Sequence, residues 1–191
     1  MASLAGGIAV AATTVASPLA HLDHHSLVGH MVQHLILMLV AAPLILLGMR
    51  TGALPRVPPA VCWLAGTGAV MLWHIPAVFT LALHSTFWHN FERGSFLLAG
   101  LLFWRPVMGS SGWTSPVYLF LATLPCDALS AFLVFCGHVV YRPHLSSLDD
   151  QQAAGALMWV AVTFFYLVPA LVLAARQLSA DGGRAAETTV A

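Results

Sequence analysis

Residues 27–48 read LVGHMVQHLILMLVAAPLILLG, an apolar stretch that holds two histidines and no Asp, Glu, Lys or Arg. A helix needs ~20 predominantly apolar residues to cross the hydrocarbon core of a bilayer. The stretch meets that length, so it predicts a transmembrane helix that carries imidazole groups into the membrane.

Apolar segments of the same character occupy most of the chain. Hydrophobic residues make up 59% of the 191 residues and charged residues only 7%, whereas a soluble domain carries about 25% charged residues. Because the breaks between segments are short and rich in turn-forming residues, we predict an all-α, polytopic transmembrane helical bundle of about six spans. The predicted segments are residues 4–19, 27–48, 60–83, 94–108, 116–140 and 153–175.

These segments are predicted to form one transmembrane helical domain over residues 1–178, followed by a short cytoplasmic tail over residues 179–191. The first segment is short and rich in alanine, as a signal peptide would be, and its cleavage would leave five spans. It lacks the basic residues with which such a signal begins, which favours a retained helix.

Arginine supplies all seven basic residues, and its distribution predicts the orientation of the chain. Five arginines fall in alternate breaks and in the C-terminal tail, and two fall in the other breaks. By the positive-inside rule, both termini then lie in the cytoplasm. On this map all ten histidines lie in extracytoplasmic loops or in the outer half of the membrane. Aromatic residues near the span ends are expected to anchor the bundle at the membrane surfaces: Trp88, Trp104, Trp113 and Tyr141.

Several function classes lack support in the sequence. Seven basic residues balance seven acidic ones, so no nucleic-acid partner is expected. The chain has no Walker-type glycine-rich loop, no GxSxG and no HExxH, and we expect it not to be an enzyme. The three cysteines form no CxxC pair, which favours small apolar residues over metal ligands or a disulfide.

The histidines of residues 27–48 form a stripe with Met38. His30, His34 and Met38 are spaced by four residues, and such side chains share one face of a helix. At 1.5 Å per residue, His34 lies ~10 Å below the outer helix end. Imidazole with thioether suits copper, and Cu(I) in particular. We therefore predict His30 and His34 as metal ligands and Met38 as a core residue; a polar helix-packing face is the alternative.

A second motif, WHIP at residues 73–76, combines a histidine with a proline that kinks the helix. His74 lies ~13 Å below its outer helix end, close to the depth predicted for His34. Two imidazoles at one depth on different helices can share an ion, so His74 is a candidate ligand. A hydrogen bond within the bundle is the alternative. Met71, one turn earlier, is a candidate soft ligand.

A third motif, HNFER at residues 89–93, opens the fourth helix. His89 and Glu92, at i and i+3, project together, as in helical carboxylate metal sites. Both are candidate ligands, while helix capping or a pair with Arg93 would explain Glu92 equally well. Asp127 is the one acid within an apolar segment; a proton or ion relay and a buried hydrogen bond both remain open.

Short motifs cover nearly the whole chain: SPL at 17–19, HMVQHLILM at 30–38, APL at 42–44, WHIP at 73–76, GLLFWRPV at 100–107, DQQAAG at 150–155 and MW at 158–159. In this order they resemble the CtaG-type assembly factors of cytochrome c oxidase. The resemblance implies a polytopic protein of the bacterial plasma membrane that is needed for oxidase maturation and linked to copper supply. Its implied partners are membrane lipid, cytochrome c oxidase subunits and, as further candidates, periplasmic copper chaperones.

Two departures from the family pattern stand out. Family members often place a second histidine directly after the acid of the His-x-x-Glu element, where this chain has Arg93, which weakens the case for Glu92 as a ligand. The N-terminus also looks short, as if an initial helix of longer relatives were absent.

The leading hypothesis is a non-enzymatic assembly factor that binds copper as Cu(I) on the extracytoplasmic side and passes it to an oxidase subunit. Its rivals are a b-type haem electron-transfer protein with His34 and His74 as axial ligands, a copper or proton transporter that uses Asp127, and a scaffold for oxidase assembly. The candidate metal ligands are His30, His34, His74, His89, Glu92 and Met71.

Overall fold

The computed structural model describes residues 2–16, 26–49, 57–109, 112–141 and 147–190, with side chains described as far as Gly183. All regular structure in these residues is helical, which confirms the all-α prediction. Elements η1 and η4 are π-helical and the others are α-helices. In chain order they are α1 (Ala2–Ala16), α3 (Leu27–Leu35), η1 (Ile36–Ala41), α4 (Ala42–Gly48), α5 (Pro59–Trp73), α6 (Pro76–Leu83), α7 (Thr86–Gly109), α8 (Thr114–Phe135), α9 (Leu148–Val162), η4 (Thr163–Leu167) and α10 (Val168–Val190).

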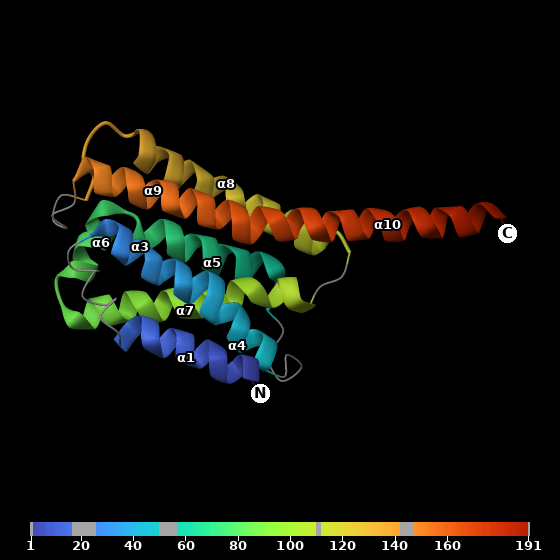
Figure 1. Cartoon of the computed structure of the whole chain (residues 1–191), viewed down its shortest axis with the longest axis horizontal. Coiled ribbons are helices and arrows are strands. Elements are labelled where there is room, and N and C mark those ends of the chain that lie inside the picture. The colour runs from blue at the N-terminus through green and yellow to red at the C-terminus, as the bar shows by residue number, and fades with distance from the viewer. Residues whose placement is uncertain (1, 17–25, 50–56, 110–111, 142–146, 191) are drawn as a thin grey trace.

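The helices pack side by side in a bundle, and α10 continues beyond it as a projecting helix (Figure 1). Helices α3, α7 and α9 begin at one end of the bundle, whereas α1 begins and α10 ends at the other. We call the end at which α3, α7 and α9 begin the histidine end. The described histidines at the helix starts and in the breaks of this end lie there: His30, His84, His89 and His138.

Length and composition qualify three helical stretches of the described chain as membrane spans: Leu27–Gly48, Thr114–Phe135 and Leu148–Gly183. Helices α5 and α6 qualify together as a fourth, bent by 76° at the break that the proline predicted. Helix α1 is apolar but has only 15 residues, fewer than the ~20 that a straight crossing needs. The chain is therefore an all-α membrane bundle, and the count of six spans stays a prediction.

Helix α7 departs from the sequence-based boundaries. Hydropathy placed residues 84–93 in a break and began the apolar segment at residue 94, but the helix starts at Thr86. The polar residues of its first turns, His89, Glu92 and Arg93, are buried inside the bundle. Average hydropathy cannot tell a polar face turned inward from a solvated loop, so it set the boundary too late, whereas the expectation that residues 89–93 open the helix is confirmed. The added turns carry Glu92 into the bundle.

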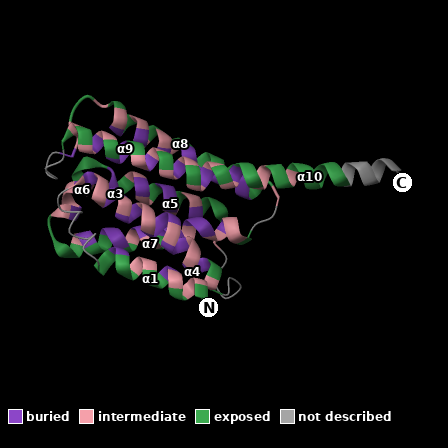
Figure 2. Cartoon of the chain, in the orientation of Figure 1, coloured by how far each residue is buried: buried purple, intermediate pink, exposed green. Residues whose placement is uncertain are grey.

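Burial divides the bundle into an inner and an outer surface (Figure 2). Large apolar side chains cover the outside, and Phe132, Phe164 and Leu171 are each more than half exposed. In a membrane span such side chains face lipid. Inside, one core cluster includes Phe103, Trp104 and Tyr166, and a smaller one includes Leu27, Met31, Phe79, Leu133 and Tyr141.

Two glycines, one in the GLLFWRPV motif and one in the DQQAAG motif, allow neighbouring helices to approach closely. A methyl group on Gly100 would lie 2.9 Å from the Ala42 Cβ and 3.0 Å from the Met38 Cα, and one on Gly155 would lie 2.9 Å from the Leu133 Cβ. Small residues at such crossings let backbones pack in contact. The GLLFWRPV and DQQAAG motifs therefore include packing positions.

The helix that carries His34 widens into π geometry at Ile36, directly after the histidine motif. A π segment interrupts the regular backbone hydrogen bonds, and such segments are frequent at functional sites. The Met38 carbonyl in η1 accepts a 2.9 Å hydrogen bond from the Trp104 indole N–H. Trp104 is 6% exposed, so the prediction that it anchors the bundle at the membrane surface is wrong.

Candidate metal centre

The histidines of the HMVQH motif lie on α3 and face the bundle interior. His30 is 1% exposed and His34 is 5% exposed. Their ring centroids lie 4.3 Å apart in an edge-to-face arrangement. The i and i+4 spacing thus brings two imidazoles side by side in a place that excludes water.

The start of α3 is held by a side chain from another helix. Asp150 of α9 accepts hydrogen bonds from the Ser26 hydroxyl at 2.7 Å and from the backbone N–H groups of Leu27 at 2.6 Å and Val28 at 3.3 Å. These are the groups that a helix N-terminus leaves unsatisfied. The acid of the DQQAAG motif therefore positions the turn that carries His30.

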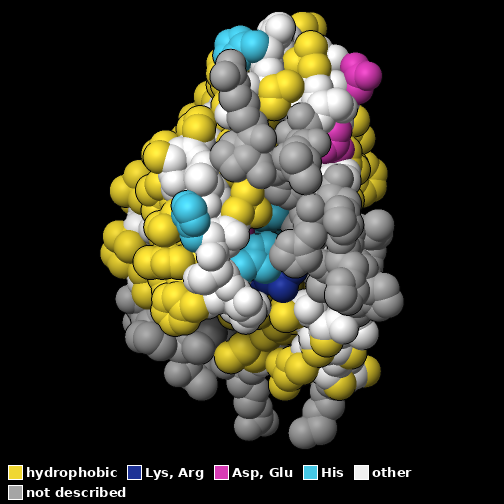
Figure 3. Space-filling model, turned by 90° about the vertical axis from the view of Figure 1, so that its left-hand side faces the viewer, with side chains coloured by type: hydrophobic (Ala, Val, Ile, Leu, Met, Phe, Trp, Pro, Cys, Tyr) yellow, Lys and Arg dark blue, Asp and Glu magenta, His cyan; other side chains and the backbone are white. Residues whose placement is uncertain are grey.

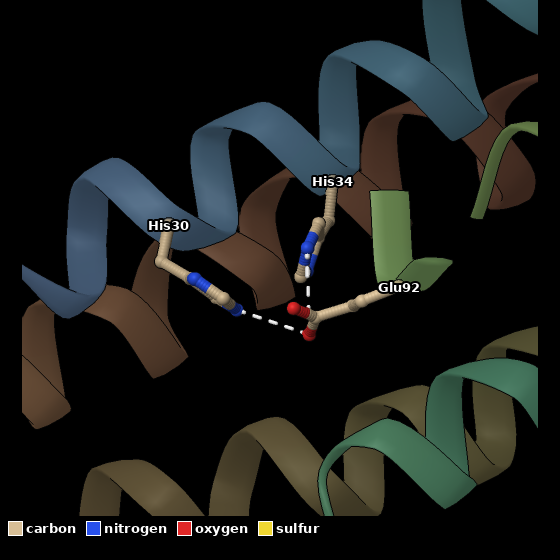
Figure 4. Close-up of side chains that lie close together, drawn as sticks. All are labelled: His30, His34 and Glu92. Carbon is tan, nitrogen blue, oxygen red and sulfur yellow. Dashed lines mark hydrogen bonds and ion pairs between the residues drawn. The ribbon is translucent and has the colours of Figure 1, made fainter. Parts of the chain in front are cut away.

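Glu92 of α7 lies opposite both imidazoles (Figure 4). Its side chain has no exposed surface. The Glu92 Oε1 lies 3.2 Å from the His30 Nε2 and 3.6 Å from the His34 Nε2. Because Glu92 lies two turns into α7, it does not cap that helix. The structure places it at the centre of the cluster, although the departure at Arg93 had weakened its case.

Two aromatic rings and a third imidazole surround the pair. His34 stacks on Phe96 with ring centroids 3.9 Å apart, and His30 contacts Phe79 at 5.0 Å. The His89 Nδ1 lies 3.7 Å from the Glu92 Oε2, and the His89 ring centroid lies 5.9 Å from that of His30. These contacts restrict the rings and keep water from the carboxylate.

The arrangement offers converging lone pairs and a buried carboxyl group. One ligand atom each from His30, His34 and Glu92 lies within 4.8 Å of the others, and no other described group of three His, Cys, Asp or Glu side chains does so. The Glu92 Oε2 is buried and accepts no hydrogen bond from the residues that the structure describes. A buried carboxylate needs a proton or a cation nearby. Two imidazoles and one carboxylate are a donor set that holds transition-metal ions in proteins.

His74 lies at the break between α5 and α6, outside this group of three. Its Nδ1–H donates to the Val70 carbonyl at 2.7 Å. His74 therefore makes a hydrogen bond within the bundle, which was the alternative to metal binding, but it does so through one ring nitrogen only. The Nε2 atom is buried and has no hydrogen-bond partner among the described residues. His74 and His34 line one cavity, in agreement with their matched depth.

The remaining candidates lie away from the cluster. Met71 is half-buried on α5 and packs against the larger core cluster. Asp127 of α8 is half-buried, and its Oδ1 lacks a hydrogen-bond partner in the described part of the chain. Histidines 21, 24, 25 and 144 lie outside the described residues. At the histidine end, histidine side chains lie in a hollow of the surface beside a basic side chain (Figure 3).

Tyr141 supports the site in a way that its sequence position did not suggest. It was predicted to be a surface anchor, but it is 1% exposed, and its hydroxyl donates to the His74 carbonyl at 2.9 Å. Burial raises the pKa of the Tyr141 phenol, which keeps it a neutral donor. Its position near a predicted helix end had indicated that Tyr141 lies at the membrane surface, and nothing in the sequence linked it to His74.

Fold and site together define an all-α membrane protein with a buried histidine and carboxylate centre near one end of its bundle. Residues 1–180 match the model of the cytochrome c oxidase caa3 assembly factor family, Caa3_CtaG, and the chain belongs to this family. Comparisons with curated proteins and with solved structures gave no match.

Proposed function

We propose that this protein binds copper at His30, His34 and Glu92 and supplies it to cytochrome c oxidase during assembly, without catalysing a reaction itself. The observation that carries the proposal is the convergence of these three buried side chains. The family assigns a role in oxidase assembly, and copper is the metal that the resemblance to CtaG-type proteins implies.

The donor set is compatible with copper and with release of the ion. Imidazole and carboxylate groups bind Cu(II) well, and a site of three protein ligands leaves a coordination position to which an acceptor's ligand can bind. His89 is the fourth candidate ligand, since its Nδ1 lies 3.7 Å from Glu92. We place the site on the extracytoplasmic side of the bacterial plasma membrane, as the arginine distribution predicts, so that copper reaches oxidase subunits or periplasmic copper chaperones there.

A b-type haem does not fit between His34 and His74. The cavity that both residues line has a volume of about 30 Å³, whereas pockets for large organic ligands measure on the order of 300–1,000 Å³. The Phe96 ring also stacks directly on His34. The site has room for an ion and not for a porphyrin.

Copper binding by the full-length protein purified in detergent tests the proposal. His30→Ala, His34→Ala and Glu92→Gln should each weaken copper binding by more than about tenfold, because each removes a ligand from the same ion. His84→Ala is the matched control, since His84 is exposed at the same end of the bundle. Equal copper affinity in all four variants would exclude the cluster as the binding site.

A further inference from the structure

A small cavity lies next to the cluster, on the inner side of His34. It has a volume of about 30 Å³ and is walled by side chains from α3, η1, α5, α7, α8, α9 and η4. Most of its wall is apolar, including Phe96, Leu39 and Val162. The described residues with sulfur or ring-nitrogen atoms that line it are Met31, Met38, Cys126, Met158, His34 and His74.

His74, which lines this cavity, has an unused ligand atom. Because a carbonyl oxygen only accepts, the hydrogen bond to Val70 fixes the proton on Nδ1. In the neutral ring Nε2 therefore carries the free lone pair. Metal-binding histidines commonly hold their second nitrogen in this way. His74 is 7% exposed, and its Nε2 has no hydrogen-bond partner among the residues that the structure describes. An unsatisfied buried acceptor costs free energy, so the atom indicates a ligand.

The donors differ from those of the outer cluster. Thioether, thiol and imidazole groups favour soft ions such as Cu(I), whereas carboxylates favour harder ones. No carboxylate is found among the described residues that line the cavity. Methionine also serves as a filler of irregular cores, but here sulfur-containing residues from three separate stretches of the chain line the same cavity as His74. The volume matches one or two water-sized spheres, and therefore a single bare ion.

We propose that this cavity is a second metal site, for a soft monovalent cation, with the His74 Nε2 as its nitrogen ligand and the sulfur atoms of Met31, Met38, Cys126 and Met158 as its soft donors. The assignment of copper as its natural ion rests on the proposed function. His34 lines the cavity and also faces Glu92 at 3.6 Å, so it connects the inner site to the outer cluster.

Binding of Ag(I), a redox-inert substitute for Cu(I), tests the inner site in the full-length protein. X-ray absorption of the silver complex in a Cys136→Ser background, which removes the accessible thiol beside His138, should show sulfur and nitrogen neighbours. The double variant Met31→Leu/Met158→Leu should weaken Ag(I) binding by more than about tenfold and leave Cu(II) affinity at the outer cluster within about twofold. Leucine matches methionine in volume, which limits repacking. Met108→Leu is the control, since Met108 packs against the core outside the cavity.

The outcomes separate the two proposals. A silver spectrum without sulfur neighbours, or Ag(I) affinity unchanged in the double variant, would overturn the inner site while leaving copper at the cluster intact. Sulfur-dependent silver binding without copper binding at His30, His34 and Glu92 would overturn the proposed function and leave the inner site standing. The spectrum of the Cys136→Ser protein, which keeps every residue of the cavity, decides the question even where the double variant does not accumulate.

Discussion

The side chain of Glu92 has no exposed surface and lies within 3.7 Å of nitrogen atoms on three imidazoles. A carboxylate in such surroundings is expensive unless a proton or a metal balances it. A packing contact between helices would be satisfied by neutral groups, which bundles of this kind use widely. The convergence of three imidazoles on one buried carboxyl group is therefore the feature that most favours an ion over a structural polar contact.

The hydroxyl of Tyr141 stabilises the broken helix beside the site. Tyr141→Phe should lower the free energy of unfolding by about 1–3 kcal/mol, because the buried His74 carbonyl then loses its donor. Thermal unfolding of the detergent-purified protein measures the effect. A Tyr141→Phe protein as stable as the wild type would show that the hydrogen bond does not hold the break.

At this scale the sequence predicted some of the side chains that lie close together in the bundle and missed others. His30 and His34 follow from the four-residue spacing, because a helix fixes which side chains share a face. The matched helix rise also indicated that His74 lies near His34, and both residues line one cavity. Cys126 and Met158 could not be connected to the site, since they reach it from α8 and α9 through packing that no local pattern encodes.

Among the helices, the contact between α9 and the start of α3 has the clearest consequence for the site. Asp150→Ala removes three hydrogen bonds to that start and should destabilise the protein by about 1–2 kcal/mol. It should also weaken copper binding, because the first turn of α3 carries His30. Asp149→Ala, the exposed neighbouring acid, should change neither quantity. Equal behaviour of the two variants in unfolding and copper titration would contradict this role for Asp150.

The helices themselves were largely predictable, and their ends were less so. Long apolar stretches identified α3 to α4 and α8 because lipid demands continuous apolar surface. Hydropathy set the start of α7 too late because its polar residues face the bundle interior, although the HNFER motif indicated that residues 89–93 belong to the helix. The angle of the bend between α5 and α6 could not be predicted from the sequence either, because the proline predicts a kink but the packing of neighbouring helices sets its angle.

For the molecule as a whole, sidedness determines which compartment the cluster serves. In a Cys136→Ser background, a cysteine at Ser85 should react with an impermeant thiol reagent added to intact cells, and one at Ser179 should not. Both positions are exposed, and they lie toward opposite ends of the bundle. Labelling at Ser179 with protection at Ser85 would invert the orientation and place the cluster toward the cytoplasm.

The central claim is that the cluster supplies copper to the oxidase, and the copper content of oxidase purified from variant cells tests it most directly. A strain that produces His34→Ala at normal membrane levels should yield oxidase with low copper and low activity, as a deletion strain should. Added medium copper should partly restore both by mass action. His34→Met should retain only part of the function, because its thioether binds Cu(I) but is a weaker ligand than imidazole for Cu(II), and His84→Ala should match the wild type. Full copper content in oxidase from the His34→Ala strain, with no response to added copper, would contradict the account and identify the protein as a scaffold.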